Sequence, residues 1–447
     1  MSLKLKNNDI TMQLILNQFN PWWQMRAVPE ALLGKPRQIL PTLYESLSLR
    51  QMTFISGLRR VGKTTLIFQL IDRLLREKNV TPYNALYFSF DESRYNLEEL
   101  FAFYQTHILQ NDLRAFERIY IFLDEIQKLP RWPEQVKILY DLHPNLKITL
   151  SGSANIIMKV KSRESLAGRF FDYKIEPLDF PEYLTFKNVL VDHAREAIFQ
   201  QTLIKEFRQF LKTGGFIEAM PFADTQLIKY FKDSILERVT YRDIPEIFSI
   251  AVPDLLLRLL GILAQTPGLY LEYKNLASDL QFDQRTITNY FSYLEYSLLI
   301  QKLYSYSTNL LSSEKRLKRV YLTNTGFTHA LTGDINFPLL MEQFWINFLK
   351  AQYFYRSPQK DEVDIVHVSE KFCLPIEIKI RENVSVKDAA ALFKFLRQFD
   401  LKEGLMISLQ TETEFANNGK RVKVLPYWKY WSILQMLEAI KANHSIF

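Results

Sequence analysis

The stretch Gly57-Leu58-Arg59-Arg60-Val61-Gly62-Lys63-Thr64 matches the pattern G-x-x-x-x-G-K-[ST] at every fixed position. It follows an apolar run at residues 52–56 and precedes residues 64–76, whose apolar side chains recur with the period of a helix. A phosphate-binding loop requires this order of strand, loop and helix. Only 13 glycines occur in 447 residues, so a chance match is uncommon. The stretch therefore predicts a nucleotide site in an α/β fold.

Each part of this loop has an expected role in holding ATP. Backbone N–H groups of the loop and of the helix N-terminus wrap the phosphates. Lys63 neutralises charge on the β- and γ-phosphates, and the Thr64 hydroxyl binds Mg²⁺. ATP and Mg²⁺ are thus the predicted cofactors, and the predicted contacts are Gly57, Leu58, Arg59, Arg60, Val61, Gly62, Lys63, Thr64 and Thr65.

A second group of candidate residues follows two later apolar runs. The run at residues 119–123 ends in Asp124, which we expect to hold Mg²⁺ through water, and Glu125, which we expect to polarise the attacking water. An acidic pair at a strand end is common alone, but beside a phosphate-binding loop it indicates hydrolysis. The next run ends near Ser151 and Ser153, which we predict to sense the γ-phosphate.

One arginine is a candidate for stabilising charge in the transition state. The segment Leu166-Ala167-Gly168-Arg169-Phe170 places Arg169 downstream of the predicted serines. It can act in the same subunit or in a neighbouring one, in which case the protein is a homo-oligomer. A surface or salt-bridged arginine explains the same residue equally well.

The pattern along the chain predicts several domains. Between residues 37 and 177, strand-like runs alternate with helical patterns, which is typical of a parallel α/β sheet; these runs are residues 52–56, 85–90, 119–123 and 147–150. A charged helical region follows. Three helical stretches and two strand-like pieces then occur in the order of a winged helix. A helix, a strand pair and another helix complete the chain.

Taken together, these motifs resemble a prokaryotic AAA-family ATPase group with a C-terminal winged helix and a restriction-endonuclease-like domain of unknown function. Further matches are Leu123-Asp124-Glu125-Ile126-Gln127, Ser151-Gly152-Ser153, Gly214-Gly215-Phe216 and Tyr241-Arg242-Asp243-Ile244. The resemblance implies ATPase activity and association with DNA. The expected domains are an N-terminal segment, an AAA-like P-loop NTPase domain, a helical connector, a winged helix and a small endonuclease-like α/β domain, at residues 1–36, 37–178, 179–251, 252–334 and 335–447.

The predicted winged helix offers a surface for DNA. Residues 275–280 and 283–296 read as a helix-turn-helix in which Asp283 caps the second helix. The polar face of that helix can reach a major groove, and a basic cluster at the expected wing can contact phosphates. The predicted DNA contacts are Arg285, Thr288, Asn289, Lys315, Arg316, Lys318 and Arg319. Winged helices attached to ATPases also serve as protein-contact modules, and that alternative stays open.

The C-terminal region contains a carboxylate cluster on two expected strands, residues 361–367 and 374–380. Glu377 and Lys379 share a face because they are two residues apart, and Asp364 can lie beside Glu377. Such carboxylates around Mg²⁺, with a lysine that orients water, cleave phosphodiesters. The arrangement resembles the PD-(D/E)XK nuclease core, with Asp364, Glu377 and Lys379 on its key positions and Glu342 on its helical acid. A solvated face carrying E-x-K is the competing interpretation.

Composition adds weaker constraints. The 56 Lys and Arg exceed the 49 Asp and Glu, giving a net charge of +7 that is compatible with an acidic polymer as partner. The single cysteine, Cys373, excludes an internal disulfide. No run approaches 18 uncharged apolar residues and the first 35 residues have no secretion-signal pattern, so we expect a cytoplasmic protein without a membrane partner.

Two other function classes compete with a DNA-coupled ATPase. The first is a nucleotide-switched protein-binding or regulatory module whose nuclease-like domain is only a scaffold. The second is a small-molecule kinase, which is disfavoured because Asp124 and Glu125 suit activation of water. Stimulation of ATP turnover by DNA distinguishes the first rival from the main hypothesis.

Overall fold

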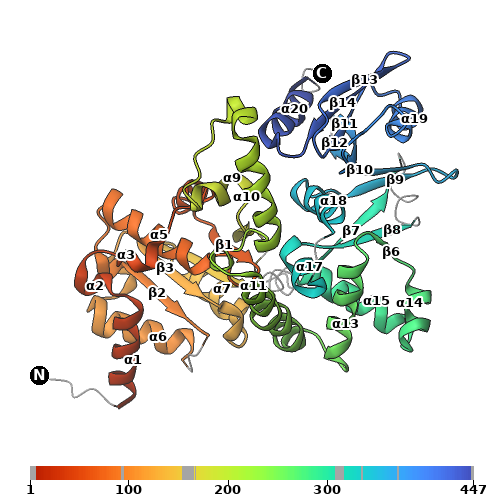
Figure 1. The fold of residues 1–447 in the computed structure, drawn as a ribbon. Coiled ribbons are helices and arrows are strands. Elements are labelled where there is room, and N and C mark those ends of the chain that lie inside the picture. Colours follow the sequence, from red (N-terminus) through yellow and green to blue (C-terminus); the bar gives the residue numbers. More distant parts are fainter. Residues whose placement is uncertain are drawn as a thin grey trace, which may run out of the picture. The chain divides into compact units, whose positions relative to one another are not determined.

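The computed structural model describes residues 7–91, 95–153, 166, 168–307, 317–333, 336–369 and 372–443. The chain divides into two compact units, Met1–Pro177 and Leu178–Phe447, which are described separately (Figure 1). None of the helices in these described ranges has the length and apolar character needed to cross a membrane.

The first unit is built on a five-stranded sheet ordered β2-β3-β4-β1-β5, in which all neighbouring strands are parallel. Its strands are β1 (Met52–Gly57), β2 (Ala85–Ser89), β3 (Ile119–Asp124), β4 (Leu146–Ser153) and β5 (Phe170–Ile175). Every residue of β1 and β3 is buried, as expected for a parallel sheet covered on both faces. The prediction of a parallel α/β sheet is confirmed, with β5 as an additional edge strand.

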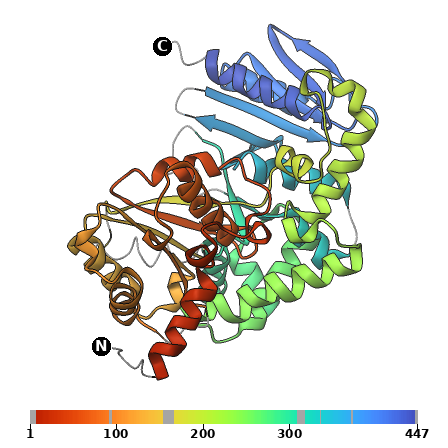
Figure 2. The ribbon, with the colours of Figure 1, turned by 90° about the vertical axis from the view of Figure 1, so that its left-hand side faces the viewer.

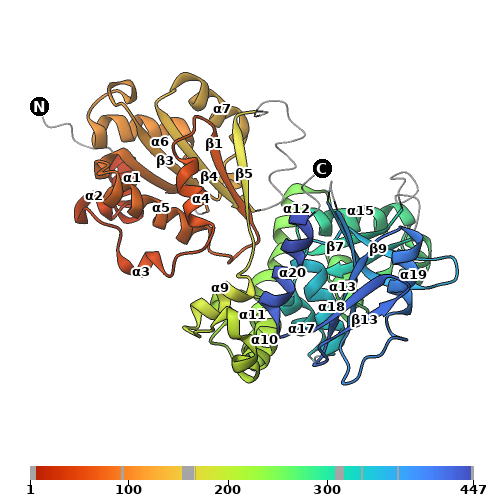
Figure 3. The same ribbon diagram turned by 90° about the horizontal axis from the view of Figure 1, so that it is seen from above.

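Helices pack around this sheet (Figure 3). They are α1 (Asn7–Phe19), α2 (Trp22–Met25), α3 (Glu30–Leu33), α4 (Leu40–Ser46), α5 (Lys63–Glu77), α6 (Leu97–Phe103) and α7 (Trp132–Leu142). Helix α5 buries Leu66, Ile67, Leu70, Ile71 and Leu74, the stripe that its sequence period predicts. The phosphate loop thus connects a buried strand to a helix anchored on the sheet.

The N-terminal segment covers the open edge of β2, the first strand of the sheet order. Asn20 mimics a neighbouring strand, because its Nδ2 donates to the Tyr87 carbonyl (2.9 Å) and its Oδ1 accepts from the Tyr87 N–H (2.7 Å). The indole N–H groups of Trp22 and Trp23 both donate to the Ala85 carbonyl, at 3.0 and 3.1 Å. The segment is therefore an integral part of the first unit.

Replacing Asn20 by Ala should loosen β2, because it leaves the Tyr87 N–H and carbonyl without partners at a buried edge. We expect the opening free energy of β2 to fall by about 1–3 kcal/mol. Amide hydrogen exchange of peptides from β2 measures this change. Gln18→Ala, on an exposed position of α1, is the matched control. Equal protection of β2 in both variants would refute the edge-pairing role of Asn20.

The second unit contains a nine-stranded mixed sheet ordered β13-β14-β12-β11-β10-β9-β7-β8-β6. Its strands are β6 (Leu269–Tyr270), β7 (Ile300–Ser305), β8 (Lys318–Leu322), β9 (Tyr353–Arg356), β10 (Glu362–Ser369), β11 (Phe372–Lys379), β12 (Glu403–Ser408), β13 (Thr413–Asn417) and β14 (Lys420–Pro426). Strands β7 and β9 pair in parallel, with Tyr304 opposite Tyr353 and Ser305 opposite Phe354. This pairing joins the two predicted C-terminal domains through one sheet.

The second unit also contains the helices that pack with this sheet. They are α9 (Phe180–Phe186), α10 (Gln200–Thr213), α11 (Asp224–Phe231), α12 (Ile244–Ile247), α13 (Pro253–Gln265), α14 (Tyr273–Leu280), α15 (Gln284–Tyr296), α17 (Thr325–Thr332), α18 (Phe337–Phe348), α19 (Ala390–Gln398) and α20 (Tyr430–Asn443). Helices α14 and α15 match the predicted helix-turn-helix, and Asp283 caps α15 by accepting from the Thr286 N–H at 2.8 Å. Helices α13 to α15 and strands β7 and β8 follow in the predicted order.

Alternating residues of the central strands face two cores, one that includes residues of α20 and one that includes residues of α19. Figure 2 shows α20, the blue helix near the C-terminus, against one face of the sheet. Leu405 and Ile407 of β12 belong to the larger core, whereas Met406 between them belongs to the smaller one. The larger core runs from Leu178 to Leu437 and takes side chains from the predicted connector, winged helix and endonuclease-like domain. These three regions therefore share one core, because the β7–β9 pairing and the helices join them.

Candidate functional site

Two glycines give the phosphate loop its shape. Gly57 ends β1 with φ of 154°, and a Cβ there would lie 2.3 Å from the carbonyl oxygen of Ile175 on the neighbouring strand. Gly62 precedes α5 in a left-handed conformation with φ of 91°, which side chains disfavour. The side chains of Leu58 and Val61 are buried, so these residues offer only their backbone to a ligand. The loop is thus fixed at both ends.

Arg37 also stabilises the loop through hydrogen bonds to backbone carbonyls. This buried guanidinium donates to the Val61 carbonyl at 3.3 Å and to the Glu176 carbonyl at 3.1 Å, connecting the loop to the end of β5. Inside the loop, the Lys63 ammonium donates to the carbonyls of Leu58 (2.9 Å) and Gly57 (3.3 Å). The positive charge therefore lies where the loop curves around it. Arg37 was not among the predicted residues.

Asp124 is the centre of the candidate nucleotide site. Its Oδ2 accepts from the Thr64 hydroxyl at 2.6 Å and from the Tyr87 hydroxyl at 2.9 Å. Its Oδ1 accepts from the Ser151 hydroxyl and from the Glu125 N–H, the latter at 3.0 Å. The carboxylate is only 2% exposed, so these donors stabilise its charge. The structure thus gathers Thr64, Asp124 and Ser151, which the sequence assigned to one site.

Glu125 occupies the position directly after β3 in a left-handed conformation with φ of 48°. The Gln127 side-chain amide donates to its carboxylate. Burial raises the pKa of Glu125, and the positive charge of Lys63 opposes that rise. A carboxyl group with a raised pKa is a stronger proton acceptor once ionised, which suits a group that polarises water.

The other predicted nucleotide residues lie around this centre. Ser153 is the last residue of β4 and stands opposite Gly57 in the β1–β4 register. The charge of Arg59 acts on Glu125, whereas Arg60 is exposed and has a positive φ of 65°. Thr65 lies in the first turn of α5. These positions place the predicted contacts at the carboxyl edge of the sheet.

Arg169 lies at the amino ends of the strands, whereas the nucleotide residues lie at their carboxyl ends. Its carbonyl accepts from the Met52 N–H at 2.8 Å at the start of β1, and its guanidinium pairs with Asp141 through two bonds of 3.0 and 3.2 Å. The length of β1, about 16 Å for its residues, separates it from Gly57. The assignment of Arg169 to the nucleotide site of its own subunit is therefore wrong.

Tyr87 is a member of the site that sequence reasoning missed. It lies in the apolar run of β2, where it is read as core, and its ring is only 5% exposed. Burial and the charge of Asp124 raise the pKa of its hydroxyl, which therefore stays protonated and donates to Asp124. The only sequence feature that could have identified Tyr87 was its hydroxyl group within an otherwise apolar strand.

The predicted C-terminal residues also come together. Strands β10 and β11 pair with Ile365 opposite Ile376, and the Ile378 N–H donates to Asp364 Oδ2 at 2.8 Å. The Lys379 ammonium pairs with the Glu377 carboxylate, which is 4% exposed and whose Oε2 is buried without a hydrogen-bond partner. Burial, together with the charges of Glu377 and Glu342, raises the pKa of Asp364.

Arg319 is the unexpected member of this cluster. Its Nη2 lies 2.6 Å from Glu342 Oε1, and its Nη1 lies 3.1 Å from Glu362 Oε1 and 3.8 Å from Asp364 Oδ1. The guanidinium is buried, so the prediction that Arg319 contacts DNA is wrong. The run of basic residues before β8 suggested a wing surface, but strand alternation turns Arg319 inward.

The two clusters differ in how they suit a metal ion. At the nucleotide site, the Thr64 hydroxyl and the Asp124 carboxylate converge as oxygen donors of the kind that Mg²⁺ prefers. Within the described ranges, by contrast, no three His, Cys, Asp or Glu side chains are grouped to hold a metal. Glu342, Asp364 and Glu377 face Arg319 and Lys379 instead, so the C-terminal residues do not fit Mg²⁺ in this arrangement.

The predicted DNA face is partly formed on α15. Arg285 and Asn289 are exposed, and the Thr288 hydroxyl donates to the Gln284 carbonyl at 2.8 Å. The Lys318 ammonium lies 4.7 Å from the centre of the Tyr304 ring. Lys315 and Arg316 lie outside the described residues. Two predicted cations, Arg285 and Lys318, therefore remain on described elements of this region.

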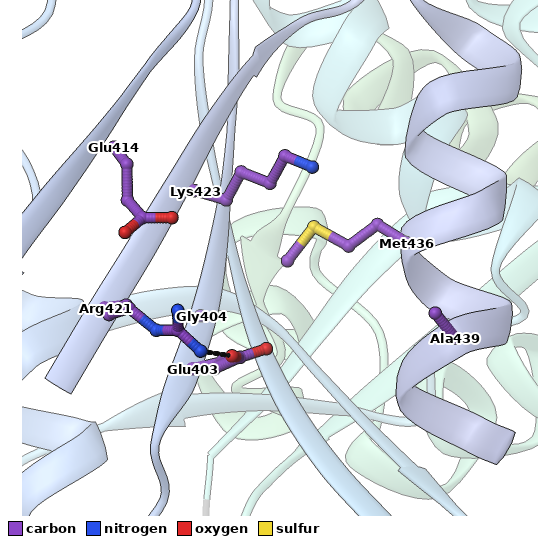
Figure 4. A pocket seen from close by; sticks show the side chains of 7 residues that line it. All are labelled: Glu403, Gly404, Glu414, Arg421, Lys423, Met436 and Ala439. Atoms are coloured by element: carbon purple, nitrogen blue, oxygen red, sulfur yellow. Dashed lines mark hydrogen bonds and ion pairs between the residues drawn. The ribbon is translucent and has the colours of Figure 1, made fainter. Parts of the chain in front are cut away.

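A hollow of about 260 Å³ lies between the sheet and α20, and its lining residues belong to neither cluster (Figure 4). Arg421 pairs with Glu403 in its wall, and Lys423 stands opposite Glu414 in the β13–β14 register. Met436 of α20 adds an apolar side. Because the guanidinium of this hollow is already paired with Glu403, we assign it no ligand.

Comparisons with known proteins find an AAA domain in the part of the chain that contains the candidate nucleotide site. Residues 49–184 match the family model described as an AAA domain, and residues 204–336 and 339–430 match two domains of unknown function, DUF8612 and DUF4143. The chain is 26% identical to each of two uncharacterized proteins of Methanocaldococcus jannaschii. With MJ1544 the match covers 85% of this chain and 87% of the relative; with MJ1637 it covers 82% of each.

Among solved structures, the Aeropyrum pernix ORC2 protein in its ADPNP-ADP complexes matches 72% of this chain and 98% of its own, with 14% identity and a TM-score of 0.39. That similarity is too low to support an inference about function. The match to the AAA domain coincides with the residues that build the loop and the Asp124 centre. Residues 49–184 are thus an AAA domain, in a chain that is similar over most of its length to the two archaeal proteins.

Proposed function

We propose that the protein hydrolyses ATP with Mg²⁺ and that its nucleotide state alters its engagement with DNA. The observation that carries the first half is the buried Asp124 carboxylate, which joins α5 through Thr64, β3 through its own backbone and β4 through Ser151. A change at the phosphates can therefore alter the contacts of α5, β3 and β4. Hydrolysis needs two carboxylates at the end of β3, and we assign these roles to Asp124 and Glu125.

The roles of the chain's own residues follow from their positions. Thr64 and Asp124 would hold Mg²⁺, which supplies charge neutralisation at the phosphate oxygens when bound. Lys63 leaves the loop carbonyls to meet the β- and γ-phosphates, while backbone N–H groups of the loop orient them. Glu125 accepts a proton from the attacking water, and Ser151 and Ser153 lie where the γ-phosphate is sensed.

DNA engagement is supported by the exposed polar face of α15 and by Lys318 at the start of β8. Arg285 and Asn289 are exposed, and both lie in the N-terminal half of the helix, which in helix-turn-helix proteins reaches base edges. A rival proposal is a nucleotide-switched protein-contact module, which uses the same surface without DNA. ATP turnover measured with and without duplex and single-stranded DNA tests the coupling. Turnover unaffected by any DNA would favour the rival.

Arg285→Ala combined with Lys318→Ala should weaken DNA binding and make its salt dependence shallower. Each lost phosphate contact lowers the slope of log K against log salt by about 0.9 for duplex DNA, so we expect a decrease of about 2. Fluorescence anisotropy titrations at several salt concentrations measure the slope. Lys387→Ala, an exposed lysine in another part of the unit, is the control. An unchanged slope in the double variant would remove these residues from the DNA interface.

A role for Arg169 remains as part of a homo-oligomer. Because it lies at the sheet edge opposite its own nucleotide site, it can only act on the nucleotide of a neighbouring subunit. Its pair with Asp141 would have to open for that purpose. Mixing Arg169→Ala chains with Lys63→Ala chains tests this role, since only an action between subunits restores turnover.

A second candidate function is phosphodiester cleavage at the C-terminal cluster. The observation that favours it is the gathering of Glu342, Asp364, Glu377 and Lys379, with the unpartnered Glu377 Oε2 among them. The described arrangement offers no metal position, so we derive no catalytic step through a metal ion. Incubation of the purified protein with several DNA forms and Mg²⁺ or Mn²⁺, with Asp364→Asn as control, tests cleavage.

A further inference from the structure

Arg319 reaches the acidic cluster from another part of the sheet. It lies on β8, whereas Asp364 and Glu362 lie on β10, and the strands β7 and β9 stand between them in the sheet order. The Arg319 side chain extends towards β10 past β9, where its guanidinium carbon lies 5.8 Å from the centre of the Phe354 ring. The side chain thus spans the junction between the two predicted C-terminal domains.

Three carboxylates of the cluster, those of Glu342, Glu362 and Asp364, already have partners. Glu342 Oε1 takes both the Arg319 guanidinium and the Tyr321 hydroxyl, each at 2.6 Å. Glu362 takes Arg319 at 3.1 Å and the Tyr270 hydroxyl at 2.6 Å. Asp364 Oδ2 takes the Ile378 N–H at 2.8 Å. A divalent ion would need several of these oxygens at about 2.0–2.6 Å, where they now face the Arg319 guanidinium or accept hydrogen bonds.

A guanidinium is well suited to this position. It is planar, stays charged at any physiological pH and presents several N–H donors in a fixed fork. One such group can therefore form ion pairs with carboxylates from α18 and β10 at the same time, as Arg319 does with Glu342 and Glu362. The ring of Tyr321 lies beside it, 5.2 Å from the guanidinium carbon. Burial strengthens each of these ion pairs relative to an exposed pair.

We propose that Arg319 is the resident cation of the C-terminal acidic site and excludes a divalent metal ion from it. The site is closed as long as this guanidinium bridges Glu342, Glu362 and Asp364. The link to cleavage rests on the second candidate function above, because a closed site cannot cut until Arg319 leaves. The exclusion of metal itself does not depend on cleavage.

Mn²⁺ binding to the full-length, nucleotide-free protein tests this proposal without any activity. Electron paramagnetic resonance of free Mn²⁺ counts bound ions, and the change caused by Asp364→Asn identifies binding at the cluster. We expect no Asp364-dependent binding in the unchanged protein and one Asp364-dependent site in Arg319→Gln. Arg319→Lys keeps a cation and should still exclude Mn²⁺. Circular dichroism and thermal unfolding establish that each variant folds.

The outcomes separate the two ideas. Asp364-dependent Mn²⁺ binding by the unchanged protein overturns the proposal, even where Arg319→Gln does not fold. A folded Arg319→Gln protein that gains no site also overturns it. A gained site together with new DNA cleavage supports both the closed site and the nuclease. A gained site without cleavage of any DNA form supports the closed site and ends the nuclease hypothesis.

Discussion

Replacing Glu125 by Gln is expected to slow ATP turnover by about 10²- to 10⁴-fold while leaving ATP affinity close to that of the unchanged protein. The amide keeps the size and the polar contacts of the carboxylate but cannot accept a proton from water. Lys63→Ala should instead weaken ATP binding by about 10- to 100-fold, because it removes a charged donor to the phosphates. Titration with a fluorescent ATP analogue and a phosphate-release assay distinguish the two effects. Equal loss of affinity in both variants would contradict the assigned roles.

The same residue predicts how turnover varies with pH. Glu125 acts in its ionised form, and burial raises its pKa above the ordinary value of 4.5. Turnover should therefore be complete above this raised pKa and fall as the pH drops through it, at a higher pH than an ordinary carboxyl group would give. The residual activity of Glu125→Gln should lack this acid limb. An identical limb in the variant would assign it to another group.

Trp345→Ala is expected to lower the stability of the second unit by about 3–5 kcal/mol. The indole is fully buried in the larger core, where it packs 5.8 Å from the Phe348 ring and 6.0 Å from the Tyr430 ring, measured between ring centres. This core takes side chains from the predicted connector, winged helix and endonuclease-like domain. The loss of stability should therefore extend over all three regions. Hydrogen exchange should accelerate in both β7 and β11.

Leu190→Ala is the matched control for this change, since its side chain is 89% exposed and its removal should shift stability by less than about 0.5 kcal/mol. Faster exchange confined to β11 in Trp345→Ala would show that the C-terminal region unfolds independently. In that case the separate domains expected from the sequence would describe the energetics better than the shared core does.

The sequence predicts local features well because they depend on neighbouring residues. The phosphate loop, its flanking strand and helix, and the cap at Asp283 each follow from a short pattern. The positions of Asp124 and Ser151 also follow, because carboxyl ends of parallel strands share one edge. Tyr87 and Arg37 could not be predicted, since their functional contacts come from packing between segments far apart in the chain.

The C-terminal cluster shows the same limit more sharply. The spacing of Asp364, Glu377 and Lys379 placed them on one face, and they do meet. The sequence could not show that Arg319 would join them, because that contact depends on the parallel pairing of β7 with β9. Nor could it show that Arg169 and the phosphate loop lie at opposite ends of β1, since the β1–β5 register is a property of the sheet.

The side-chain cover on β2 bears on how this protein can be shortened. A chain that begins at residue 49, where the AAA family match starts, retains the loop, Asp124 and Glu125 but loses Asn20, Trp22, Trp23 and Arg37. It would present a bare strand edge, which recruits other strands and leads to self-association. A fragment that stays monodisperse is therefore expected to include helices α1 to α4, although these four helices contribute no residue to the nucleotide motif.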